Sequence, residues 1–197
     1  MFKNISLGPL LLLLLMACVD EDTLPPGTQL MLNPHISLSH DSVFPWTANK
    51  SDGIELGVSK EVFMTGIQSL FIENRDSVNL NYGSWTQTYS GPMPAQGSTL
   101  ELIAFLKGEN ISSVFPTSPR VYISFRIFPQ SDSKGNTQGR SAGSDSYSFL
   151  EGDFDWTPII ITLDNFPSEA DNISVNLGML SGTTGKIYFD EITLTVK

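Results

Sequence analysis

The 197-residue chain contains a single cysteine, Cys18, close to its N-terminus. The remainder of the chain therefore has no thiol and can form neither an internal disulfide nor a cysteine-ligated metal site. Positive charge is also scarce, because 11 Lys and Arg residues stand against 21 Asp and Glu residues, giving a formal net charge of −10. A chain of this charge repels phosphate backbones and offers no basic stripe, which argues against nucleic-acid binding.

The N-terminus lacks an apolar run long enough to span a membrane. Lys3 precedes an apolar stretch over residues 5–17, which is shorter than the roughly 20 residues that a transmembrane helix needs and is typical of a signal peptide. The motif Leu15-Met16-Ala17-Cys18 resembles a lipobox, in which a small residue precedes the cysteine that is acylated, as with palmitate. We expect a signal peptide at residues 1–17 and a lipid on Cys18 that anchors the protein to the outer membrane. The alternative is an ordinary signal peptide with an incidental cysteine.

An acidic cluster and a proline-rich segment follow the cysteine. Asp20, Glu21 and Asp22 resemble the export signal of surface-exposed lipoproteins in polysaccharide-foraging Gram-negative bacteria, although they are equally read as a solvated charge run. Pro25-Pro26-Gly27 can continue neither a helix nor a central strand. We therefore expect a linker over residues 18–35 and one domain over residues 36–197.

The domain lacks helical periodicity, whereas several segments alternate apolar and polar residues with period two. The clearest lies at residues 121–128, and a change of parity between Asp190 and Ile192 predicts a β-bulge. The polar stretch 130–145 is expected to be a surface loop. We predict an all-β fold, an antiparallel β-sandwich, with strands at residues 69–73, 78–82, 84–90, 99–107, 121–128, 146–150, 156–163, 173–179 and 186–196.

Three motifs carry a resemblance to a known family. They are Gly66-Ile67-Gln68-Ser69-Leu70, the segment 102–108 with Lys107, and the closing run from Gly185 to Ile192. In this order they resemble the strands of jelly-roll carbohydrate-binding modules of the galactose-binding-like superfamily, over roughly residues 54–197. The resemblance implies a jelly roll that binds glycans.

Two segments combine aromatic and planar polar side chains in the way that sugar sites do. Trp85, Gln87 and Tyr89 share one face of the segment 84–90, and Tyr122 shares a face with Arg126. These five residues are the candidate glycan-binding residues. In the alternative interpretation, Trp85 and Tyr89 belong to the core, while Tyr122 and Arg126 cover an outer face.

The resemblance also implies a structural calcium ion, because the aspartate that corresponds to Asp190 binds calcium in many such modules. Glu55, Glu61 and Glu73 are possible partners, but none stands in a recognisable motif. The alternative is that Asp190 caps the predicted bulge by accepting hydrogen bonds from backbone N–H groups. No other cofactor is expected.

The remaining aromatic and titratable residues suggest structural roles. Trp46 is expected either to form a binding platform or, as is more common, to plug an end of the sandwich. The family resemblance implies that Trp156 belongs to the core. His35 and His40 are poorly spaced for a metal, and no catalytic motif occurs, so we expect no enzymatic activity. A structural or assembly lipoprotein that binds another protein is the alternative to a glycan-binding protein.

Overall fold

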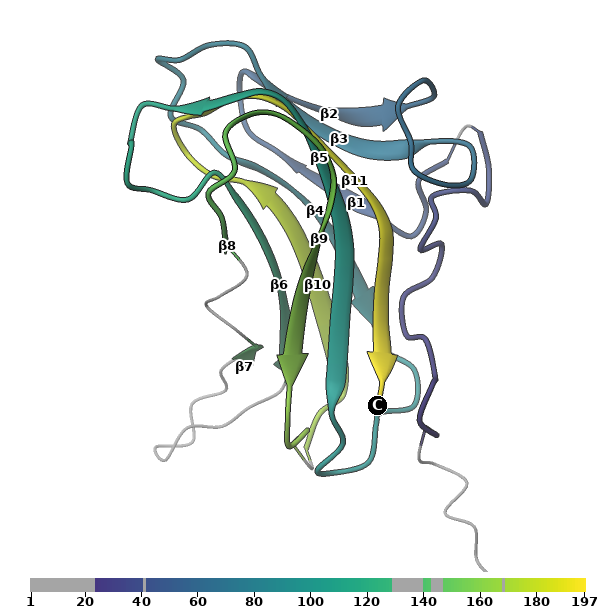
Figure 1. The fold of residues 1–197 in the computed structure, drawn as a ribbon. Coiled ribbons are helices and arrows are strands. Elements are labelled where there is room, and N and C mark those ends of the chain that lie inside the picture. Colours follow the sequence, from purple (N-terminus) through teal and green to yellow (C-terminus); the bar gives the residue numbers. More distant parts are fainter. Residues whose placement is uncertain (1–23, 41, 129–139, 143–146, 168) are drawn as a thin grey trace, which may run out of the picture.

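Two antiparallel sheets pack face to face (Figure 1). The computed structural model describes residues 24–40, 42–128, 140–142, 147–167 and 169–197. Sheet A has the strand order β1-β4-β10-β6-β7, with β8 also paired to β6, and sheet B has the order β2-β3-β11-β5-β9. In Figure 1, β5, β9 and β11 lie in front of β4, β6 and β10. The prediction of an antiparallel β-sandwich is confirmed.

The strands are β1 (Thr47–Lys50), β2 (Ile54–Ser59), β3 (Ser69–Asn74), β4 (Gly83–Tyr89), β5 (Leu100–Ser113), β6 (Val121–Phe128), β7 (Arg140–Ala142), β8 (Tyr147–Ser148), β9 (Gly152–Leu163), β10 (Asn172–Met179) and β11 (Thr183–Val196).

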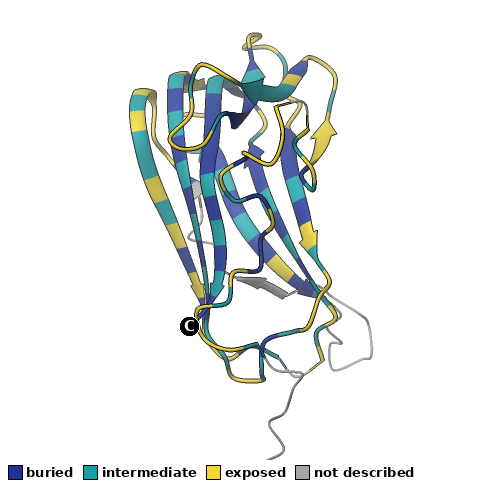
Figure 2. Ribbon diagram, turned by 90° about the vertical axis from the view of Figure 1, so that its right-hand side faces the viewer, coloured by how far each residue is buried: buried dark blue, intermediate teal, exposed yellow. Residues whose placement is uncertain are grey.

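Period-two alternation determines which side chains enter the space between the sheets. Every second residue of β6 and β10 is buried, and Figure 2 shows the resulting bands of buried and exposed residues along the strands. Large side chains from both sheets fill the core, among them Phe125, Leu102, Leu177, Phe189 and Ile192. Burial of these apolar surfaces is the main force that holds the two sheets together.

The predicted bulge in the last strand is confirmed. β11 lies at the centre of sheet B between β3 and β5, and its register with β5 shifts between Asp190 and Thr193. Glu191 adopts a positive φ of 51°, which inserts the extra residue and restores Ile192 and Leu194 to the core.

The strands β1 and β2 were not predicted, and three predicted segments differ in the structure. Residues 78–82 form an exposed loop and not a strand, because Val78, Leu80 and Tyr82 find no partner strand and point into solvent. β5 continues through residues 108–113, beyond residue 107 where the predicted strand ends, since Asn110 at a φ of 52° absorbs an irregularity in the register. β7 lies within the predicted loop 130–145, whose other residues lie outside the described part of the chain.

The segment predicted to be a linker is part of the sandwich from residue 24 onward. Gln29 forms a bridge with Thr195, and the N–H group of Leu30 donates to the carbonyl of Leu194 at 2.8 Å. The side chains of Leu30 and Met31 are buried in the core. The proline-rich motif ends in Gly27, whose N–H group donates to Val196 O at 2.7 Å, so the segment is fixed along β11.

The two tryptophans outside β4, Trp46 and Trp156, differ in burial. Trp46 is buried in the core, as expected for a plug. Trp156 is only half-buried and does not belong to the core cluster, which corrects its assignment. Trp156 lies on the same outward side of β9 as the exposed Ile160, and the register shift between Leu106 and Gly108 turns Phe154, in place of Asp155, toward the core.

The signal peptide and the lipid on Cys18 lie outside the described residues and stay predictions. Within the described ranges, no helix has the length and apolar character needed to cross a bilayer.

Leu30 tests whether the N-terminal segment contributes to the fold. We expect Leu30→Ala to lower the free energy of unfolding by about 2–5 kcal/mol, because it leaves a cavity in the core. Leu32→Ala is the matched control, since the Leu32 side chain is 60% exposed and that of Leu30 is 1% exposed. Urea unfolding followed by tryptophan fluorescence measures both. Equal stability of the two variants would show that the segment only lies on the surface.

Candidate functional site

The outer face of sheet A carries mainly short polar side chains. Because most inward positions of its strands are apolar, the intervening residues point outward. The register places them in rows that run across the strands: Asn49–Ser84–Gly178–Tyr122, Thr47–Thr86–Asn176–Ser124 and Thr88–Ser174–Arg126, with Phe128 opposite Asn172.

Hydrogen bonds connect these rows from strand to strand. The Nδ2 atom of Asn49 donates to Oγ1 of Thr86 at 2.8 Å, and the Thr86 hydroxyl donates to Oδ1 of Asn176 at 2.9 Å. The chain of donors orients the Asn176 amide on the central strand of the sheet. This face therefore presents oriented hydroxyl and amide groups to solvent.

Tyr122 lies over a glycine of the neighbouring strand. Tyr122 and Gly178 are paired across β6 and β10, and a Cβ atom on Gly178 would lie 2.0 Å from Cε1 of the tyrosine ring. Gly178 thus makes room for the ring to rest against the backbone of β10. The half-buried ring of Tyr122 occupies one end of β6, and the half-buried ring of Phe128 occupies the other.

The structure does not bring the two predicted groups of glycan-binding residues together. Tyr122 and Arg126 lie on the outer face, but Trp85 and Gln87 face the core and are 3% and 2% exposed. The Trp85 indole N–H donates to Phe71 O at 3.0 Å, and the Gln87 side chain bonds both the N–H and the carbonyl of Leu32.

Tyr89 points to the same side as Trp85 and Gln87. Its ring packs against the core, burial raises its pKa, and its hydroxyl donates to Pro92 O at 2.7 Å. The prediction that Trp85, Gln87 and Tyr89 form a surface site is therefore wrong. These three residues face the core because the register of β4 with β10 sets them opposite the buried Leu177, Val175 and Ile173.

The outer face of sheet B carries charges that neutralise one another. Lys186 Nζ lies 4.0 Å from the centre of the Phe71 ring and 3.6 Å from Glu73 Oε2. Arg75 pairs with Glu73 at 2.6 Å and with Glu55 at 3.5 Å, and its hydrogen bonds lower the pKa of Glu73. A cavity of about 370 Å³ adjoins this network, lined by Glu73, Asn74, Arg75, Glu109, Asn110, Thr184, Gly185 and Lys186.

Two aromatic rings on this face are covered. Tyr188 and Phe71 are buried beneath the charged side chains, and the Tyr188 hydroxyl donates to Glu109 at 3.0 Å. Desolvation, assisted by Glu109, raises the pKa of Tyr188 far above its ordinary value. The rings of Phe71 and Tyr188 are therefore not open for stacking by a sugar.

Asp190 is fully buried and accepts three backbone hydrogen bonds. Its carboxylate receives the N–H groups of Met64 at 2.8 Å, Thr65 at 3.1 Å and Glu191 at 2.8 Å. The carboxylate thereby ties the β2–β3 loop to the bulge of β11. This is the capping role that the sequence offered as the alternative to calcium binding.

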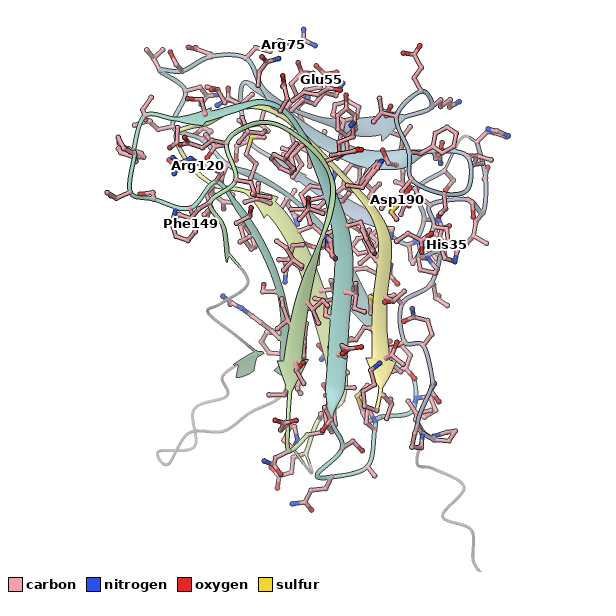
Figure 3. All side chains as sticks on the ribbon, in the orientation of Figure 1. His35, Glu55, Arg75, Arg120, Phe149 and Asp190 are labelled. Carbon is pink, nitrogen blue, oxygen red and sulfur yellow. The ribbon has the colours of Figure 1, made fainter. Side chains whose placement is uncertain are left out.

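Two of the proposed calcium partners of Asp190, Glu55 and Glu73, are already paired with Arg75. Figure 3 shows Glu55 and Arg75 at the upper end of the sandwich and Asp190 lower down near His35, whose Nδ1 atom is 2.9 Å from Glu191 Oε2. Across the part of the chain that the structure describes, no group of three or more His, Cys, Asp or Glu side chains is arranged to hold a metal ion. Calcium at Asp190 stays a prediction.

The end of the sandwich formed by the β3–β4, β5–β6, β8–β9 and β10–β11 loops is apolar. Arg120, itself buried, pairs with Glu151 and donates to the carbonyls of Phe115 and Pro116, and Figure 3 places it close to Phe149. Large apolar side chains are exposed around it, namely Val78, Leu80, Val114, Phe115, Phe149 and Leu150. A cavity of about 420 Å³ opens here, lined by Phe115, Ser118, Pro119, Leu180 and Ser181.

Sequence reasoning missed most of the outer face of sheet A. Phe128 and the polar residues Asn49, Thr86 and Asn176 were not considered as site residues. Phe128 has the same parity as Tyr122 in the clearest alternating segment, so that signal was available. The positions of Asn49 and Thr86 depend on the pairing of β1 with β4, and β1 was not predicted.

No protein-family model and no curated protein matches the chain. A CBM22-1 xylan-binding domain from Paenibacillus barcinonensis Xyn10C superposes with a TM-score of 0.54 at 17% identity, covering 88% of this chain and 97% of that domain. A Stig cyclase, Fisc from Fischerella sp. TAU, superposes with a TM-score of 0.58 at 10% identity, covering 87% of this chain and 98% of the cyclase.

The enzymatically active domain of bacteriophage CBA120 tailspike protein 4 superposes with a TM-score of 0.56 at 16% identity, covering 86% of this chain. This chain spans 21% of the length of that domain. At such low identity the similarity shows the fold alone. The chain is an all-β sandwich of two antiparallel sheets that resembles the jelly rolls of carbohydrate-binding modules.

Asp190 gives the sandwich a distinctive dependence on pH. Burial raises its pKa above the ordinary value of 3.8, against the opposing effect of its three N–H donors. The folded state therefore favours the protonated form, so the contribution of Asp190 to stability is complete below pH 3.8 and is lost as the pH rises through the folded-state pKa. We expect the difference in unfolding free energy between the wild type and Asp190→Asn to fall with rising pH in urea titrations.

Asp155→Asn is the control of opposite sign. The hydrogen bond from Lys107 lowers the pKa of Asp155, so any stability from this pair is present at neutral pH and lost on acidification. A wild-type advantage over Asp190→Asn that grows with pH would contradict the assignment of a raised pKa.

Proposed function

We propose that the protein is a non-catalytic glycan-binding protein that holds a polysaccharide on the outer face of sheet A. The observation that carries the proposal is the pairing of two half-buried aromatic rings, Tyr122 and Phe128, with rows of oriented hydroxyl and amide groups between and beside them. An aromatic ring stacks on the apolar face of a pyranose, while planar polar groups bond its hydroxyls.

The dimensions of the face suit a chain of sugars. Tyr122 and Phe128 are six residues apart on one strand, which corresponds to about 20 Å at the usual rise of about 3.3 Å per residue. The neighbouring strands β10 and β4 add polar rows at spacings of about 4.8 Å. Several consecutive sugar rings fit along β6 with their hydroxyls over Asn176 and its neighbours.

Two further observations support this function. The sandwich is similar to that of a domain described as xylan-binding. Among the described residues, no carboxylate occupies an outward strand position of sheet A, and hydrolysis of glycosides commonly requires a pair of them. The face is therefore suited to binding and not to cleavage.

The location we propose is the outer membrane, with the lipid on Cys18 as the anchor. Residues 24–34 run along β11 and reach the end of the sandwich where Val196 lies. A tether that leaves the domain there would keep the outer face of sheet A in water beside the membrane. The fold itself needs no membrane-spanning segment for this arrangement.

Removal of the Tyr122 ring tests the site directly. We expect Tyr122→Ala to weaken binding to a polysaccharide on a glycan array about tenfold, or about 1.4 kcal/mol, through loss of stacking. Ile160→Ala on the outer face of sheet B is the matched control, because Ile160 is also exposed and should leave affinity unchanged. Titration calorimetry with the best array ligand measures both variants.

Gly178→Ala gives a second variant that leaves the tyrosine in place. The added methyl group displaces the Tyr122 ring from β10, so affinity should fall while the protein remains folded. Circular dichroism confirms the fold in each variant. Absence of binding across a broad array, or unchanged affinity in both variants, would contradict the proposal.

A second candidate function is contact with another protein through the apolar end of the sandwich. The observation that favours it is the set of exposed apolar side chains around the cavity at Phe115, since contiguous apolar patches of this kind often mark protein contacts. In pull-downs from solubilised membranes, a stoichiometric partner should be captured by wild type and by Tyr122→Ala, but not by the double variant Phe115→Ser, Phe149→Ser. Capture that survives the double variant would exclude this end as the contact surface.

A further inference from the structure

The two outer faces of the sandwich differ in charge. The outer face of sheet B carries both signs, with carboxylates at Glu55, Glu73, Glu101, Glu109 and Asp155. At the outward strand positions of sheet A that the structure describes, Arg126 is the one charged residue and there is no carboxylate. In a chain with 21 acidic and 11 basic residues, one face is thus kept free of negative charge.

Arg126 also differs from five other cations of the chain in its partners. These five are neutralised by carboxylates, namely Arg75, Lys107, Arg120, Lys186 and Lys197. Arg126 is exposed, and no acidic side chain within the described ranges pairs with it. An exposed guanidinium without an internal counter-ion has its full set of donors available for an anion from solution.

The surroundings of Arg126 match an anionic group on a sugar ring. Ser174 lies directly opposite Arg126 on β10, Ser124 precedes it by two residues on the same face, and Phe128 follows it by two. A guanidinium binds a carboxylate or sulfate through two parallel hydrogen bonds, and serine hydroxyls can donate further ones. The nearby Phe128 ring would contact the apolar part of the same sugar.

From this charge pattern we infer that the glycan is an acidic polysaccharide, whose carboxylate or sulfate groups are bound by Arg126. The inference rests on the proposed glycan-binding function and names the substrate class of that site. Because the net charge of −10 disfavours general adsorption of polyanions, attraction to an acidic chain must come from a local site such as this one.

The test compares acidic and neutral forms of the same polymer. Wild-type protein is titrated with polygalacturonate and with its carboxyl-reduced form, and separately with dextran sulfate and dextran. We expect at least one acidic polymer to bind roughly tenfold more tightly than its neutral form, in line with the loss of a charge-assisted hydrogen bond. The first pair reports on a carboxylate and the second on a sulfate.

Arg126→Gln should abolish the preference for the acidic polymer and leave residual binding to the neutral one. Arg75→Gln, which removes a cation from the other face, should leave the preference unchanged. Equal or tighter binding of the neutral forms, or a preference that survives Arg126→Gln, would overturn the inference while leaving glycan binding intact. No binding of any polymer by the wild type, or unchanged affinity in the Tyr122→Ala protein, would instead count against the proposed function itself.

Discussion

Because Ile173, Val175 and Leu177 of β10 must enter the core, the register with the two neighbouring strands assigns every side chain of β4 and β6 to one of the two faces of sheet A. On β6 this assignment sends Tyr122 and Arg126 outward. On β4 it sends Trp85 and Gln87 inward. A slip of one residue on either strand would exchange the two faces and expose the core, so the binding surface depends on the same burial energy that holds the sheets together.

The sequence was sufficient for the fold class and for the parity of β6, β10 and β11, because those strands alternate strictly and even the bulge near Asp190 leaves a visible change of phase. It was not sufficient for β4. In β4 a tryptophan, a glutamine and a tyrosine alternate with small polar residues. From this pattern alone, the side that faces the core cannot be distinguished from the side that faces solvent. Gln87 is buried because it bonds both backbone groups of Leu32, a partner 55 residues away that no local pattern reveals.

Non-local contacts of this kind also explain why the N-terminal segment was taken for a linker. Its prolines exclude regular structure locally, yet Leu30 and Met31 complete the core against β11, and Gln87 fixes the backbone next to them. Asp190 does the same for the β2–β3 loop, since its buried carboxylate satisfies three N–H groups that would otherwise lack acceptors. Buried polar side chains therefore hold the irregular segments in place. The N-terminal segment in turn contributes buried apolar side chains to the core.

The contrast between the two outer faces follows from how each covers its aromatic residues. On sheet B, Lys186 lies over the rings of Phe71 and Tyr188 and pairs with Glu73, and Glu109 accepts a hydrogen bond from the Tyr188 hydroxyl. On sheet A the small residues Gly178, Ser174 and Ser124 cannot cover a ring, so Tyr122 and Phe128 remain partly exposed and the nearby Arg126 has no described counter-ion. Exposed aromatic rings and an unpaired guanidinium are stabilised only when a ligand supplies the missing contacts. The outer face of sheet A is therefore the face at which recognition is expected.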